Sequence, residues 1–240
     1  ASDRGASDLT VAGKLFCDRF PPDKIPALPT CGIFLRREFP LKNNLEFPEG
    51  IHPCEDGLFS HFVLALTEKI SFCPEAVYHY RQHEQGNHHQ IRKRTADILP
   101  MIPRWLSLIE EFYEQRHLWK RKAGHLVRFI EHEPFELRLL GMPFSPPEQE
   151  ILYSIIRDFL TAHCTAAECR RASLHLPFRL LLQSSGFSDF GRRLRRAGKN
   201  TGIRRKLLHF CPVPSWRRNG RAQLRQVREQ LEEIRRNITF

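Results

Sequence analysis

Several features that would place this chain of 240 residues in a protein class are missing from it. No apolar run approaches the roughly eighteen residues that a membrane-spanning helix needs, and the first residues lack the charged-then-apolar pattern of a signal peptide. The motif Asp-x-Asp does not occur, and no glycine-rich phosphate loop is present. Because 41% of the residues are hydrophobic, we expect the chain to fold around an apolar core. Because it lacks a long apolar run, we do not expect it to span a membrane.

Cysteine pairs of the Cys-x-x-Cys type are also absent, although the chain has seven cysteines. An odd number of scattered cysteines argues against a disulfide framework or a zinc knuckle and favours a reducing cytoplasm. Cys164 and Cys169 lie near His163, so the three side chains are candidate metal ligands. Their place in a strongly helical stretch favours ordinary core or surface thiols.

Positive charge is present in excess, and it is confined to the end of the chain. Residues 192–240 carry fifteen Lys or Arg and three acids, whereas the preceding 191 residues carry 23 basic and 24 acidic residues. A basic segment of this kind suggests a polyanionic partner, either an acidic membrane surface or a nucleic acid.

The first part of the chain reads as a mixture of helices, loops and short strands. Capping residues, apolar spacing and turn residues predict a helix over 7–19, an extended segment over 31–39, a long loop over 42–57, a helix over 58–68, and strands over 69–73 and 76–81. From about residue 92 the pattern becomes helical. It predicts a helix over 103–120, another after Gly124, one opened by Ser145 and ending near His163, and one opened by a capping box at Thr165.

An acid pair, Glu55 and Asp56, stands between a Pro-Cys turn and the predicted helix over 58–68. Carboxylates at a helix start complement the positive end of the helix dipole, so a purely structural role is open. The later segment VYHYRQHEQGN brings Arg81, His83 and Asn87 into a loop. If this segment folds back toward the acids, the two carboxylates and the side chains of the loop lie close together at one side of a sheet.

The order of these features resembles the carboxy-terminal half of the catalytic domain of glycosyltransferase family 2, the inverting enzymes of the GT-A fold. The similar stretch runs over about residues 9–92, through RREF, NNLEFPEGI, the acid pair, KISFCPEAVYHYR and QHEQGN. The resemblance implies an α/β fold, mainly α in its second half, in which a partial GT-A-like subdomain with short strands precedes a helical region. The expected divisions are residues 1–92 for the acceptor-side part, 93–190 for the helical region and 191–240 for the basic tail.

The same resemblance implies roles for the residues that match. Asp56 would be the general base that takes a proton from the acceptor hydroxyl, and Glu55 would orient the acceptor or brace the loop. His83 would help to hold a divalent metal, Mg or Mn, or the pyrophosphate, while Arg81 and Asn87 would bind leaving-group charge. The structural alternative is that Arg81 simply pairs with one of the two acids.

The chain departs from the family in lacking the nucleotide-binding half that ends in Asp-x-Asp. We therefore expect the acceptor-side portion of an inverting glycosyltransferase, excerpted or truncated, which alone binds a nucleotide-sugar donor poorly. The acceptor would be a cell-surface glycan or a lipid-linked saccharide, and the location the cytoplasm, at the inner face of the cell membrane. The alternative is a non-catalytic helical interaction module.

The basic tail over 192–240 leaves three interpretations open. Its apolar stripe among arginines suits the surface of an anionic membrane, and it consists of Leu224, Val227, Leu231, Ile234 and Ile238. The stripe equally suits packing on the protein or on a second copy in a homodimer. Binding to nucleic acid through phosphates is the least favoured of the three.

Overall fold

The computed structural model describes residues 33–67, 70, 94–173 and 175–207, with 225 and 229, and only the backbone of 199–207. The described residues form two compact units, one ending at Glu133 and the other beginning at Pro134, and each is treated by itself. The helix predicted over 7–19 lies outside the described residues. So do the two segments predicted as strands, except Ile70, which belongs to no helix or strand.

The prediction of an α/β, GT-A-like fold with short strands is wrong. The described part of the chain is 74% helical and contains no strand. The physical reason is visible in the first unit, where helices cover one another and no sheet is needed to bury the apolar side chains. The helices described in this unit are α2 (Glu38–Lys42), α3 (Glu55–Leu66), α5 (Thr95–Ile98), α6 (Met101–Gln115) and α7 (Trp119–Ile130).

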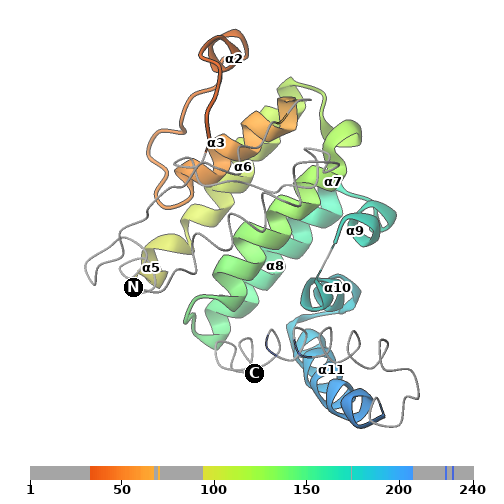
Figure 1. The fold of residues 1–240 in the computed structure, drawn as a ribbon. Helices are drawn as coiled ribbons and strands as arrows, with labels where there is room; N and C mark the ends of the chain where they lie inside the picture. Colours follow the sequence, from red (N-terminus) through yellow and green to blue (C-terminus); the bar gives the residue numbers. More distant parts are fainter. Residues whose placement is uncertain are drawn as a thin grey trace, which may run out of the picture. The chain divides into compact units, whose positions relative to one another are not determined.

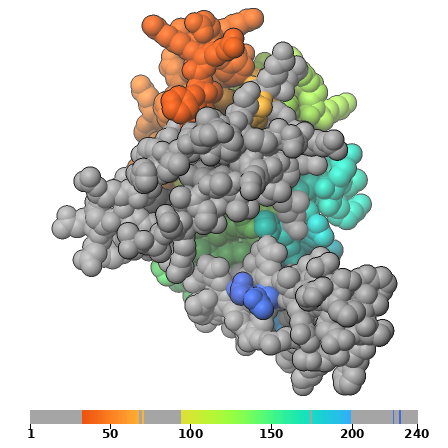
Figure 2. Space-filling model, in the orientation of Figure 1, coloured from red at the N-terminus to blue at the C-terminus, as the bar shows by residue number. Residues whose placement is uncertain are grey.

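Helix α3 is the centre of the first unit, and it packs on both α6 and α7 (Figure 1). Every residue from Gly57 to Ala65 is buried, so this helix is covered on all sides. Helix α2 differs, because none of its residues is buried, and it stands out at the surface in Figure 2. A helix enclosed in this way holds its first turn in a fixed position.

A polar cluster lies inside this packing. The hydroxyl of Tyr113 on α6 lies 3.2 Å from Nε2 of His61 on α3 and 3.3 Å from Nδ1 of His125 on α7. The two imidazole rings stack with centroids 4.2 Å apart. All three side chains are fully buried, so their hydrogen bonds link the three helices as well as satisfying buried polar groups.

Several predicted boundaries change. The helix following the acids begins at Glu55 rather than at residue 58, so both acids lie in its first turn. The segment predicted as extended over 31–39 contains the start of α2. The helix predicted over 103–120 ends at Gln115, because His117 adopts a positive φ of 54° and the chain restarts as α7.

The second unit is built on α8 (Pro146–His163), with α9 (Ala166–Ala172), α10 (Leu176–Gln183) and α11 (Phe187–Leu207). Helix α10 packs on α8 and α11, and α11 also contacts α8 (Figure 1). The predictions for α8 and α9 are confirmed, including the capping box at Thr165, and the structure has a second capping box at Ser145. At the second, the Ser145 amide and hydroxyl both donate to Glu148 Oε2, at 2.7 and 2.6 Å.

A wide helix, η3 (Glu131–Leu140), continues directly from α7 and has π-type turns. Pro134 lies inside it, and a proline removes a backbone donor from the helical ladder. Gly141 follows at a point where a Cβ atom would lie 2.7 Å from the carbonyl oxygen of Leu137. Only glycine fits there, and the glycine marks the end of the helix.

Candidate active site at the start of helix α3

The loop before α3 is fastened to the first unit at several points. Leu45, Ile51 and Cys54 are buried, and the Arg116 guanidinium donates to the carbonyl oxygen of Asn43 at 2.6 Å. Cys54 adopts a positive φ of 90°, which is rare for a residue with a side chain. This turn delivers Glu55 and Asp56 to the first positions of the helix.

Asp56 combines exposure with an unfavourable setting for its charge. Its side chain is exposed, and Oδ1 accepts a hydrogen bond from the amide of Gly57 at 2.8 Å. Partial desolvation of the carboxylate raises the pKa of Asp56, and the negative charges of Glu133 and Glu55 raise it further. Backbone hydrogen bonds act in the opposite direction without cancelling the rise. A carboxylate of this kind is a stronger base than an ordinary surface aspartate.

Glu133 is the member of this site that the sequence did not reveal. It lies in η3, its side chain is buried, and its Oε1 would be 3.2 Å from a Cβ atom placed on Gly57. The only local signal is Gly57 itself, because glycine inside a helix often marks a close approach by another group. Three carboxylates, those of Glu55, Asp56 and Glu133, therefore share one end of α3.

Glu55 has a partner on the other side. Its Oε1 lies 3.3 Å from Nδ1 of His52, three residues earlier, and both side chains are partly exposed. The contact ties the loop to the first turn of α3. Such a position suits the role of a brace for the loop, which was one of the two roles expected for Glu55.

The structure does not describe the positions of the other three predicted site residues. Arg81, Asn87 and His83 lie outside the described residues, so their expected meeting with the acids stays a prediction. Among the residues with described positions, no group of three His, Cys, Asp or Glu side chains is arranged to hold a metal ion. The Mg or Mn site was expected at His83, which lies outside the described residues, so it stays a prediction.

The basic tail begins inside the second unit. Helix α11 starts at Phe187, and Phe190 and Leu194 are buried, so its first turns pack into the core. Asp189 holds Arg193 at 2.8 Å and Arg192 at 3.2 Å. Arg196, further along, is exposed. Apart from Arg225 and Glu229, the tail beyond residue 207 lies outside the described part, including the whole apolar stripe.

No helix within the described ranges is long and apolar enough to cross a membrane. Comparison with known proteins assigns the chain to no family. No protein-family model matches the chain, no curated protein matches its sequence, and no solved structure matches its fold.

Proposed function

We propose that this protein takes part in glycosyl transfer from a nucleotide-sugar donor to a hydroxyl acceptor, with inversion at the anomeric carbon. Asp56 is the general base: its carboxylate accepts the proton of the acceptor hydroxyl as that oxygen attacks the anomeric carbon. The nucleotide diphosphate leaves from the opposite face. The acceptor is a glycan or a lipid-linked saccharide.

One observation carries this proposal. Asp56 is an exposed carboxylate at the first turn of a buried helix, and desolvation and two neighbouring acids raise its pKa. A general base works best when its pKa approaches the working pH and its position is fixed. An acid placed only to complement the helix dipole gains nothing from two further carboxylates beside it.

The order of the sequence features supports the same reaction. The acid pair is followed by an apolar helix, then by KISFCPEAVYHYR and QHEQGN, as in family 2 glycosyltransferases. Glu55 fixes the loop through His52, and Glu133 acts on Asp56 by charge. The roles of Arg81, His83 and Asn87 at the leaving group belong to the proposal, and no step of it is routed through a metal.

The test is transfer by the Asp56→Asn variant of the complete protein. Release of nucleotide diphosphate is measured with a panel of nucleotide sugars and with glycan and lipid-linked acceptors. Loss of a general base lowers the rate by at least about 100-fold. Glu49→Gln is the matched control, because Glu49 is an exposed carboxylate in the same loop. Transfer by Asp56→Asn at the wild-type rate would contradict the proposal.

A second candidate function has one observation in its favour. Beyond the packed turns of α11, Arg195 and Arg196 are exposed at the start of the basic tail. A non-catalytic module that binds anionic membrane surfaces would use this segment. Sedimentation with phosphatidylserine and neutral vesicles at two salt concentrations separates the candidates. Preference for anionic vesicles together with no transfer by the complete protein would favour the module.

A further inference from the structure

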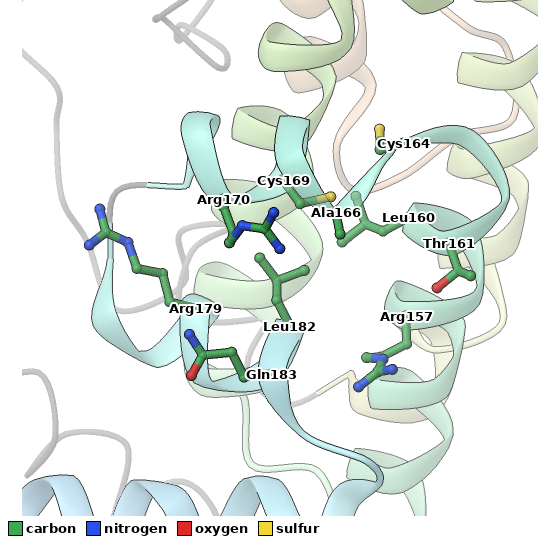
Figure 3. Close-up of a pocket in the computed structure, with 10 residues that line it drawn as sticks. All are labelled: Arg157, Leu160, Thr161, Cys164, Ala166, Cys169, Arg170, Arg179, Leu182 and Gln183. Carbon is green, nitrogen blue, oxygen red and sulfur yellow. The ribbon is translucent and has the colours of Figure 1, made fainter.

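An arginine-lined pocket lies in the second unit, between α8, α9 and α10 (Figure 3). Its volume is about 460 Å³, which falls in the range of roughly 300–1,000 Å³ typical of small-ligand sites. The lining contains three cations and no acid. Its residues are Arg157, Leu160, Thr161, Cys164, Ala166, Cys169, Arg170, Arg179, Leu182 and Gln183.

The arginines reach the pocket from different helices. Figure 3 shows Arg170 extending from α9 over Leu182 and Arg157 approaching from α8, while the Arg179 guanidinium lies further out, at the rim. Arg157 is held in place because its Nη1 donates to the carbonyl oxygens of Ser184 and Leu181. Its Nε and Nη2 take no part in these bonds and remain for a ligand.

No carboxylate neutralises these cations within the described parts of the chain. Arg179 donates from Nε and Nη2 to the carbonyl oxygen of Ser173, at 3.3 and 3.0 Å, and so keeps its full charge. The nearest acid along α9, Glu168, is occupied in the helix cap, where its Oε2 accepts from the amide and hydroxyl of Thr165. The pocket therefore has a concentrated positive charge.

We propose that this pocket binds a ligand that joins a phosphate or diphosphate group to a small apolar part. Guanidinium groups offer paired donors that match the several oxygens of a phosphate. Three cations suit a group with two or more negative charges better than a single carboxylate. Leu160, Ala166 and Leu182 supply the apolar surface for the rest of the ligand. The inference goes beyond glycosyl transfer and does not depend on Asp56.

The thiols of the pocket offer a way to observe binding there. Cys164 and Cys169 are hydrogen-bonded to each other, which lowers the pKa of Cys169 and raises that of Cys164. Cys169 lines the pocket, and its lowered pKa makes it the more reactive of the two thiols, because the thiolate is the nucleophile. A ligand that occupies the pocket therefore slows alkylation of Cys169, whereas an anion bound only to the basic tail does not.

The experiment is titration calorimetry of the full chain with inorganic pyrophosphate, with acetate at equal ionic strength as the reference anion. Arg170→Gln removes one exposed cation of the pocket, and Arg171→Gln removes the next arginine of α9, which is not part of the lining. Loss of one charged contact weakens binding about tenfold for Arg170→Gln and less than about twofold for Arg171→Gln.

A second arm identifies the source of the phosphate. Peptide mass spectrometry monitors the alkylation of Cys169 by iodoacetamide, in the presence of pyrophosphate or of vesicles that contain phosphatidic acid. Protection by pyrophosphate points to a soluble phosphate compound, and protection by the vesicles alone points to a lipid headgroup. Both results support the proposal when Arg170→Gln abolishes them. Absence of protection by either probe, or equal behaviour of the Arg170→Gln and Arg171→Gln variants, overturns it.

Discussion

The Glu133 carboxylate lies against Gly57: Oε1 of Glu133 is 3.2 Å from the position that a Cβ atom would take on that glycine. Cys54 Sγ is 3.0 Å from the same position. The buried carboxylate of Glu133 therefore packs directly against the first turn of α3, at the position where Gly57 has no side chain. This contact brings the charge of Glu133 to bear on Asp56.

Gly57→Ala is expected to destabilise the protein despite the helix preference of alanine. Replacing glycine inside a helix ordinarily adds about 0.5–1 kcal/mol to stability. Here the new methyl group displaces Cys54 or Glu133, and overpacking of this kind costs about 1–3 kcal/mol. We expect a lower midpoint in urea denaturation followed by circular dichroism.

Gly198→Ala is the control for that change, because Gly198 lies in α11 and, among the described residues outside its own stretch of helix, no atom lies within 4 Å of an added Cβ. This variant should be as stable as the wild type or more stable. Equal effects of the two substitutions would show that the packing of Glu133 on Gly57 is not tight.

Asp56→Asn is expected to stabilise the protein at neutral pH. The fold raises the pKa of Asp56, so the ionised side chain is disfavoured in the native state. The contribution of Asp56 to stability falls as pH rises from its unfolded value of 3.8 to the higher native value, and then stays constant. The asparagine variant should therefore have the higher melting temperature at pH 7, and the difference should shrink as the pH falls from the native pKa of Asp56 to 3.8.

The measurement is thermal unfolding of wild type and variant from pH 3 to pH 7. Glu49→Gln again serves as the control and should change the melting temperature little over this range. A lower melting temperature for Asp56→Asn at pH 7 would contradict the claim that the fold disfavours the ionised form of Asp56.

Asp189→Asn should act in the opposite sense in the second unit. Hydrogen bonds from Arg193 and from the amide of Ser185 lower the pKa of Asp189 to about 2. The resulting stability is fully present above the unfolded value of 3.8 and is lost as the pH falls toward 2. We expect the variant to melt at a lower temperature than wild type at pH 6 and at the same temperature near pH 2. A difference that persists at pH 2 would assign the effect to something other than the carboxylate charge.

Local signals in the sequence were sufficient to predict where some of the helices begin. Ser145 with Glu148, and Thr165 with Glu168, are capping boxes whose hydrogen bonds form within four residues, so α8 and α9 begin where predicted. The acids at 55 and 56 were predicted in a loop directly before a helix, and that helix begins three residues earlier than predicted, at Glu55. In each case the residues that determine the structure are close together in the chain.

Other features could not be predicted, because they depend on residues far apart in the sequence or have no local sequence signal. The α/β prediction is wrong because the described residues bury their apolar side chains in helix-to-helix contacts, whereas the two segments predicted as strands lie outside the described residues apart from Ile70. Neither glycine nor proline marks the break at His117 between α6 and α7, so one helix was predicted there. Glu133 reaches α3 from η3, and its contact with Gly57 is a tertiary contact that no local pattern encodes.

The most direct measurement of the central claim is the pH dependence of kcat/KM for nucleotide diphosphate release by the complete protein. If Asp56 is the base, the acid limb reports its pKa in the free enzyme. Glu133→Gln removes one cause of the raised pKa, so the account predicts that the acid limb moves to lower pH in this variant and is absent in Asp56→Asn. An acid limb that stays in place in Glu133→Gln, or that persists in Asp56→Asn, would contradict the account.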